Sequence, residues 1–185
     1  VYDGLLRPVY RWHAQTAWPL AAELSPEGDA LAVLAASEAG GQLRLFSLGS
    51  EEERARFESP GEYFIDLAWM DGGLCLLSED RAVFLDEGGA QTGEYGFGSA
   101  RLRDCAFGGD FALLVLEEAG QVSLVSLDAS GGLIAQLSPG RDFVSAEAEK
   151  DKIAVLYSDG AAVYNKNLRE RGSGAQAAGA QALLL

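Results

Sequence analysis

The chain has 185 residues, of which 48% are hydrophobic, and this is enough for one sizeable core. Lys and Arg number 14 against 28 Asp and Glu, which gives a net charge of −14. A surface this acidic repels phosphate backbones and anionic membranes, so we expect no nucleic-acid partner. No run approaches the roughly 20 apolar residues that a membrane-spanning helix requires.

The chain opens with a predicted strand, a turn and a second strand in residues 1–10, "VYDGLLRPVY". The same arrangement recurs in residues 84–95, "FLDEGGAQTGEY". Residues 1–18 are therefore expected to be the last strands of a unit that precedes the repeats described next.

The next segment, residues 20–34, is the first of four that have the same form. Each predicts a strand, a polar turn and an apolar strand, and the turn recurs about every 40 residues. The four segments are "LAAELSPEGDALAVL" (20–34), "FIDLAWMDGGLCLL" (64–77), "LRDCAFGGDFALLVL" (102–116) and "FVSAEAEKDKIAVL" (143–156).

Each of the four segments is followed by a third and a fourth predicted strand. The third strands alternate, with Leu43, Leu45 and Leu48 expected on one face of the first and Val122, Leu124 and Leu127 on one face of the third. The fourth strands are more polar. The second strands are apolar throughout, as expected for strands that are buried on both faces.

Four strands per unit at a period near 40 residues predict an all-β fold, a β-propeller of about four four-stranded blades, as a partial ring or the C-terminal half of a larger propeller. Helical repeats of similar length are disfavoured because turn residues arrive every 8 to 12 residues. The predicted boundaries are 1–18 for the end of a preceding blade, 19–63, 64–101, 102–140 and 141–170 for four blades, and 171–185 for a Gly/Ala linker with one further strand at "ALLL".

Conventional catalytic and metal-binding motifs are not found in the sequence. His13 is the one histidine, there is no Gly-x-Ser-x-Gly elbow, and no spacing of His, Cys or Asp matches a zinc or calcium site. Cys75 and Cys105 lie in apolar runs, which favours buried free thiols over a disulfide. We expect no enzymatic activity, no cofactor and no metal.

The strongest candidate for chemistry is the pair Asp66 and Asp104, which occupy matching positions of two first strands. First strands line the central channel of a propeller, and Glu23 and Ser145 lie near the corresponding positions of the other two blades. Converging oxygens of this kind could bind a ligand or a cation. The simpler interpretation is that they bond turn backbone or face channel water.

Aromatic residues offer a second candidate surface. Trp12, Trp18 and Trp69 with Tyr10 could stack on a carbohydrate or a peptide. Trp69 aligns with Phe107, so packing between blades is the favoured role for Trp69.

"PEGDALAVL" and "SLVSLDASGGLIAQL" resemble blades of WD-repeat and quinoprotein-like propellers, although Trp-Asp and Gly-His dipeptides are absent. The order "VYDGLLRPVYRWH…LSPEGDALAVL…IAVLYSDGAAVYNKNL" is similar to an uncharacterised family of membrane-anchored propeller proteins of Gram-positive bacteria. The resemblance implies an extracytoplasmic domain with an N-terminal anchor before Val1. It carries no catalytic residues.

We therefore expect a non-enzymatic binding or scaffold domain. Its expected partner is another protein or the missing half of the same propeller, and exposed blade faces could also form a homo-oligomer. The alternative is a ligand- or metal-binding sensor, or an enzyme, that uses the acidic residues of the channel.

Overall fold

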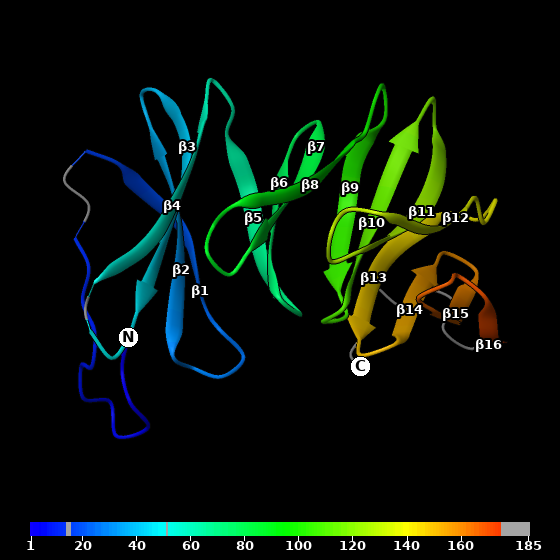
Figure 1. The fold of residues 1–185 in the computed structure, drawn as a ribbon. Helices are drawn as coiled ribbons and strands as arrows, with labels where there is room; N and C mark the ends of the chain where they lie inside the picture. The colour runs from blue at the N-terminus through cyan, green and yellow to red at the C-terminus, as the bar shows by residue number, and fades with distance from the viewer. Residues whose placement is uncertain (14–15, 51, 175–185) are drawn as a thin grey trace.

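The computed structural model describes residues 1–13, 16–50 and 52–174, and every regular element in these residues is a β-strand. Sixteen strands form four antiparallel sheets of four (Figure 1). Blade 1 contains β1 (Trp18–Leu24), β2 (Ala30–Ser37), β3 (Gly40–Ser47) and β4 (Glu53–Pro60), and blade 2 contains β5 (Phe64–Met70), β6 (Gly73–Ser78), β7 (Arg81–Asp86) and β8 (Gln91–Gly96). Blade 3 contains β9 (Arg101–Phe107), β10 (Phe111–Glu118), β11 (Gln121–Asp128) and β12 (Leu133–Leu137), and blade 4 contains β13 (Phe143–Glu149), β14 (Lys152–Tyr157), β15 (Gly160–Asn165) and β16 (Glu170–Gly174).

Strands follow each other in sequence order across every sheet, so each blade is a four-stranded meander. Figure 1 shows the four blades side by side in a row, from blue at blade 1 to orange at blade 4. The prediction of about four propeller blades is confirmed. The gaps between consecutive sheets are residues 61–63, 97–100 and 138–142, and the last strand, β16, ends at Gly174. The predicted strand at "ALLL" lies outside the described residues.

The second strands of blades 2 and 3 are buried on both faces because each of these blades has a neighbouring blade on both sides. In β6, Leu74 and Leu76 pack against blade 1, while Cys75 and Leu77 pack against blade 3. Period-two alternation sends successive side chains to opposite faces, so a strand in this position must be apolar at every residue.

Side chains of the third strands also alternate between the two faces, and the expectation that Leu43, Leu45 and Leu48 share one face was wrong. Leu43 and Leu45 face blade 2, but Leu48 packs with the cluster on the opposite side of blade 1. Leu124 likewise faces blade 4 and Leu127 faces blade 2. A residue three positions further along a strand has the opposite parity and therefore points to the other face.

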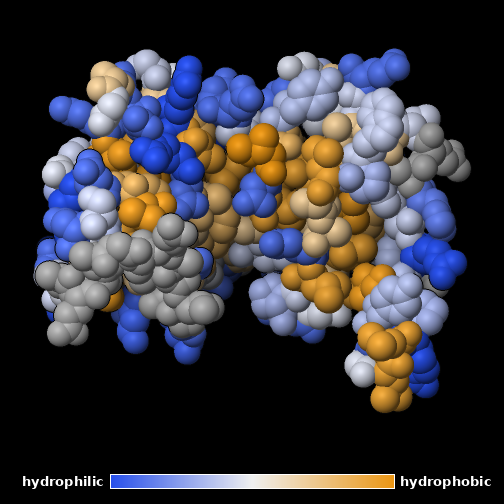
Figure 2. All heavy atoms as spheres, turned by 180° about the vertical axis from the view of Figure 1, so that it is seen from behind, coloured by the Kyte–Doolittle hydropathy of each residue, from blue (hydrophilic) through white to orange (hydrophobic). Residues whose placement is uncertain are grey.

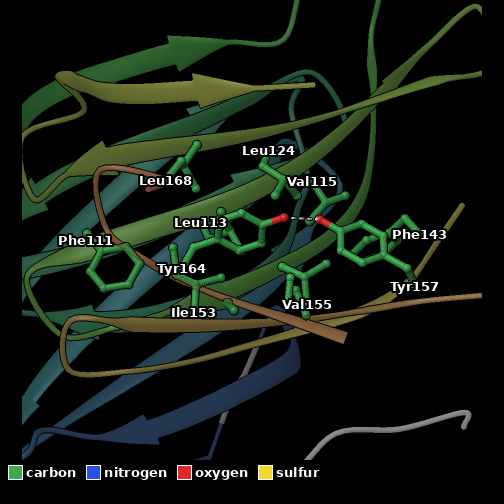
Figure 3. Packing of buried hydrophobic residues seen from close by; sticks show 13 residues of the cluster. Phe111, Leu113, Val115, Leu124, Phe143, Ile153, Val155, Tyr157, Tyr164 and Leu168 are labelled. Carbon is green, nitrogen blue, oxygen red and sulfur yellow. Dashed lines mark hydrogen bonds between the residues drawn. The ribbon is translucent and has the colours of Figure 1, made fainter. Parts of the chain in front are cut away.

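Three hydrophobic clusters fill the spaces between consecutive blades. The cluster between blades 3 and 4 is shown in Figure 3, where Phe111, Leu113 and Val115 of β10 meet Ile153 and Val155 of β14. Tyr157 and Tyr164 cross this cluster, and their hydroxyl groups form a hydrogen bond of 3.1 Å. Burial of the Tyr157 ring raises the pKa of its hydroxyl.

A fourth, smaller cluster lies on the side of blade 1 that faces away from blade 2. Here Tyr10 and Trp12 pack against Phe46, at ring-centroid distances of 5.6 and 5.7 Å. Residues 1–10, which we name the N-terminal hairpin, thus cover part of blade 1, and they project at the lower left of Figure 1.

The N-terminal hairpin has the same turn as the outer hairpins of complete blades. Asp3 N–H donates to Arg7 O (3.0 Å) and Leu6 N–H donates to Asp3 O (2.9 Å), and the Asp3 carboxylate accepts from two backbone N–H groups of the turn. The turn at Asp86 repeats each of these bonds. Residues 1–10 therefore have the geometry of the third and fourth strands of a blade.

Within residues 1–13, 16–50 and 52–174, no helix has the length and apolar character needed to cross a membrane.

Candidate functional site

Each inner strand carries a β-bulge at the same place, and the bulges decide where the candidate site residues point. The register shifts lie between Pro19 and Ala21 in β1, between Phe64 and Asp66 in β5, and between Phe143 and Ser145 in β13. In β9 the shift falls between Leu102 and Asp104. A bulge leaves one residue unpaired and redirects the residues that follow it.

The unpaired bulge residues are Leu20, Ile65, Arg103 and Val144, and we name them the bulge row. Leu20 and Ile65 are 54% and 57% exposed and Val144 is 38% exposed. Figure 2 shows the face opposite to that of Figure 1, with apolar atoms gathered across its middle between charged borders. Three of the four residues of the bulge row, Leu20, Ile65 and Val144, are therefore exposed apolar residues.

Asp66 and Asp104 follow the bulges directly, and each carboxylate accepts a hydrogen bond from the next blade. Asp104 Oδ2 accepts a hydrogen bond from Ala146 N–H of blade 4 at 3.1 Å, and its Oδ1 accepts from Cys105 N–H at 2.9 Å. Asp66 Oδ2 accepts from the Cys105 thiol at 3.7 Å, and its Oδ1 accepts from Leu67 N–H. Both aspartates therefore link consecutive inner strands.

Ser145 occupies the equivalent position in blade 4, because Asp66, Asp104 and Ser145 all pair with matching residues of the second strand. Its buried hydroxyl has no hydrogen-bond partner in the structure. In blade 1 this position is Ala21, and Glu23 lies two residues further along. The offset arises because the turn between β1 and β2 has five residues, 25–29, whereas the turn between β5 and β6 has two, 71–72.

Glu23 contributes to the link between blades 1 and 2 through its backbone. Its carbonyl oxygen accepts from the Trp69 indole N–H at 3.2 Å. Desolvation raises the pKa of the Glu23 carboxyl, with a smaller contribution from the charge of Asp66. Among the described residues, no group of three or more His, Cys, Asp or Glu side chains is arranged to hold a metal ion.

Both cysteines are free thiols on either side of the interface between blades 2 and 3. Cys75 is buried and Cys105 is half-buried. Desolvation, with the negative charges of Asp66 and Asp104, raises the pKa of Cys105 to about 12. A thiol with this pKa stays protonated at neutral pH and is a poor nucleophile.

The aromatic residues do not form one stacking surface. Trp12 and Tyr10 are used in packing on Phe46, and Trp69 packs between blades 1 and 2. Trp18 is exposed, and so is His13.

The loops that connect one blade to the next form clefts that the sequence analysis did not identify. Residues 59–64, "SPGEYF", and 138–143, "SPGRDF", repeat the same motif. The first borders a cleft of about 660 Å³ that also contains Ile65 and the turn Ser78–Arg81. The second borders a cleft of about 420 Å³ that includes Arg103 and Arg141. The repeated Ser-Pro-Gly was the signal that could have located them.

In the larger cleft a charged pair lies beside exposed apolar side chains. Arg81 donates to Glu62 at 2.9 and 2.5 Å and to Glu94 at 2.7 Å. Hydrogen bonding to Arg81 lowers the pKa of Glu62 to about 2. Tyr63 and Ile65 on the same wall are exposed.

No protein-family model and no curated protein matches the sequence. Solved structures match the fold at low identity. BBS1N in complex with ARL6DN gives a TM-score of 0.65 at 11% identity, with 92% of this chain and 59% of that chain covered. The Neurospora crassa Pan2 WD40 domain gives 0.58 at 11% identity, covering 86% and 50%. BamB from Moraxella catarrhalis gives 0.54 at 12% identity, covering 92% and 56%.

The chain therefore spans between half and three fifths of the length of these structures. Likeness at this identity shows the architecture alone, and the architecture is that of a β-propeller.

Proposed function

We propose that this chain is a protein-binding scaffold domain without a catalytic centre, and that it forms part of a larger propeller. The observation that carries the proposal is the larger cleft between blades 1 and 2, where Tyr63 and Ile65 lie exposed beside the charged Glu62–Arg81 pair. Exposed apolar side chains with a polar border are typical of protein-interaction surfaces.

The use of the acidic residues supports a non-enzymatic role. The carboxylates of Asp66 and Asp104 each accept a hydrogen bond from the following blade. A carboxylate used in this way holds inner strands together, which is a structural task. BBS1N, one of the similar structures, was solved in complex with ARL6DN, so a protein of this fold binds another protein.

The binding surface is tested by substituting the two exposed residues of the cleft. Tyr63→Ser with Ile65→Ser should leave the fold intact, because both side chains are exposed, and should abolish the retention of partner proteins from an extract of the source cells. Leu133→Ser, which changes an exposed leucine of the outer strand β12, is the matched control. Equal retention by all three proteins would contradict the proposal.

The alternative is a metal or ligand sensor in the channel, and it is favoured by the unpartnered hydroxyl of Ser145. A thermal-shift screen with Ca²⁺, Mg²⁺, Mn²⁺ and Zn²⁺ separates the two functions. We expect no change in Tm. A rise of several degrees with one ion, absent in the double variant Asp66→Asn, Asp104→Asn, would establish the alternative.

We further propose that the domain is extracytoplasmic and anchored at its N-terminal side, as the C-terminal half of a propeller. The resemblance to membrane-anchored bacterial propellers supports this location. Cell fractionation with an antibody against the domain tests it, and recovery in the cytoplasmic fraction would contradict it.

A further inference from the structure

The two Ser-Pro-Gly loops, loop 1 (residues 59–64) and loop 2 (residues 138–143), meet their own blades differently. Loop 1 closes onto the turn between β2 and β3, because Gly61 N–H donates to Ala39 O at 2.8 Å. The cleft that remains between loop 1 and this turn has a volume of about 30 Å³. Loop 2 faces the equivalent turn between β10 and β11, and the cleft there has a volume of about 420 Å³.

The backbone of loop 2 lacks the bonds that close loop 1. Gly140 is equivalent to Gly61, and within the part of the chain that the structure describes, the N–H groups of Gly140 and Arg141 donate to no protein atom. β4 stays paired with β3 up to Gly40, the first residue of β3, whereas β12 leaves β11 at Leu124. Backbone N–H groups without a protein partner are free to bind an anion.

The first residue after each turn explains the difference. Loop 1 closes over Gly40, where a Cβ would overlap the carbonyl oxygen of Ser59 and would lie 2.8 Å from the backbone nitrogen of Gly61. The equivalent residue of blade 3 is Gln121, because Gly40 and Gln121 begin β3 and β11 and pair with the last residues of β2 and β10. A side chain at this position keeps loop 2 away from the turn, so the cleft stays open.

Two arginines line the open cleft, and both keep unused N–H groups. Arg103 Nη1 lies 3.3 Å from a carboxylate oxygen of Glu117, and its guanidinium forms no hydrogen bond within the described residues. Arg141 donates from Nε and Nη2 to one oxygen of Asp159, at 2.9 and 2.7 Å. Nη1 of Arg141 bonds nothing among the described residues. Each guanidinium can therefore donate to a further acceptor.

The lining favours a ligand with one negative charge and an apolar body. Arg103 and Arg141 contribute two positive charges, and Asp142 contributes one negative charge. The Phe143 ring, labelled in Figure 3, and Val122 are the apolar part of the lining, and the guanidinium carbon of Arg103 lies 6.0 Å from the centroid of this ring. Guanidinium groups are well suited to bind carboxylates, and the volume is in the range of small-molecule sites.

We propose that the cleft between loop 2 and the β10–β11 turn binds an organic carboxylate with an apolar body. Arg103, Arg141 and the backbone N–H of Gly140 hold the carboxylate, and the apolar body lies on Phe143. The ligand is a free acid or the C-terminal carboxylate of a polypeptide, since both present the same group. This site is separate from the cleft between blades 1 and 2, which carries the proposed function.

N-acetylphenylalanine is a suitable probe, because it joins one carboxylate to one aromatic ring. We expect saturable binding to the 185-residue protein in an NMR titration of the backbone amides, with the largest shifts at Gly140 and Arg141. N-acetylphenylalanine amide, which lacks the charge, should bind about tenfold more weakly.

A pentapeptide that ends in phenylalanine distinguishes the two sources of the carboxylate. Tighter binding of the pentapeptide than of N-acetylphenylalanine would identify a polypeptide C-terminus as the ligand. Equal or weaker binding of the pentapeptide would identify a free acid.

Arg103→Met should weaken the binding of N-acetylphenylalanine about tenfold and leave the fold intact, because this side chain is 42% exposed. Arg171→Met, which changes an exposed arginine of β16, is the matched control and should leave binding unchanged. Gln121→Gly should also weaken binding, because loop 2 can then close onto the turn as loop 1 does.

Absence of binding to the folded protein would overturn the proposal, and so would equal affinity for the acid and its amide. Equal affinity of wild type and Arg103→Met would overturn it as well. Tighter binding of inorganic phosphate than of N-acetylphenylalanine would show a general anion site and would contradict the assigned ligand. None of these results involves Tyr63 or Ile65, so the proposed function is tested separately.

Discussion

Two loops of this chain, residues 59–64 and 138–143, each connect one blade to the next, but the residue after the glycine is acidic in the first loop and basic in the second. Each starts with Ser-Pro-Gly, with Gly61 and Gly140 at φ of 78° and 64°, and each leads from the last strand of one blade into the inner strand of the next. Each ends in a phenylalanine, Phe64 or Phe143, that is buried between the blades.

The residue after the glycine is Glu62 in one loop and Arg141 in the other. Glu62 bonds Arg81, the first residue of β7, and Arg141 bonds Asp159 in the turn between β14 and β15. The two loops thus form ion pairs of opposite polarity, whereas the glycine and the phenylalanine are shared. We infer that the apolar anchor holds the blades together and that the ion pair fixes the loop against the turn.

The two pairs also differ in their surroundings. Glu62 is shielded and accepts a further hydrogen bond of 2.6 Å from Ser59 Oγ, while Asp159 is exposed. Arg141 stacks on the Tyr157 ring at 4.0 Å from the ring centroid, which Arg81 does not do. The first loop thus depends on hydrogen-bonded charge and the second on stacking.

The largest expected effect comes from removing the shared anchor. Phe64→Ala should lower the free energy of unfolding by about 3 to 5 kcal/mol, because it opens a cavity between blades 1 and 2. Phe143→Ala should cost less, since Phe143 is 8% exposed against 1% for Phe64. Urea unfolding of both variants measures this, and an equal or reversed order would show that burial does not set the cost.

The second prediction separates the two ion pairs. Glu62→Gln should lower the free energy of unfolding by about 1 to 2 kcal/mol, because the half-buried Arg81 loses a charged acceptor. Asp159→Asn should leave the melting temperature almost unchanged, since the pair is open to solvent. A larger loss of unfolding free energy for Asp159→Asn than for Glu62→Gln would show that the exposed pair stabilises the protein more than the shielded pair.

The third prediction tests whether the sign of the first pair is free. Glu62→Arg and Arg81→Glu should each destabilise the protein, and the double variant should be more stable than either single variant. Recovery should be incomplete, because Glu94 accepts from Arg81 in the native protein and would face a carboxylate after the exchange. A double variant less stable than both single variants would show that the pair is not interchangeable.

Much of the fold could be predicted from the sequence because a propeller repeats one local pattern. The apolar second strands and the polar turns before them recur at regular spacing, and the second strands are buried as expected, for example at Leu31, Leu76, Val115 and Val155. Such patterns report burial on both faces directly.

The candidate site could not be predicted in the same way. Asp66 and Asp104 were placed correctly on inner strands, but the direction of their side chains depends on a bulge at the preceding residue. A bulge shifts the register by one residue and leaves no mark in the spacing of apolar residues. The partners of both carboxylates lie about 40 residues away in the chain, so only the assembled blades show that they link neighbouring strands.

The last and smallest effect is on the pH dependence of stability. Hydrogen bonding to Arg81 lowers the folded-state pKa of Glu62 from 4.5 to about 2, so this carboxyl binds a proton more weakly in the folded than in the unfolded protein. Its contribution is therefore fully present above about pH 5 and is lost as the pH falls from about 5 to about 2. Lowered pKa values of Glu53, Asp128 and Asp159 act in the same direction, so the wild-type curve alone does not isolate Glu62.

Arg81→Met should flatten the acid limb of a plot of unfolding free energy against pH, because Glu62 then loses the partner that lowers its pKa. Arg141→Met should flatten the acid limb less, because the carboxylate of Asp159 that it leaves unpaired is exposed. Parallel acid limbs for wild type and Arg81→Met would show that Arg81 does not lower the pKa of Glu62 in the folded protein.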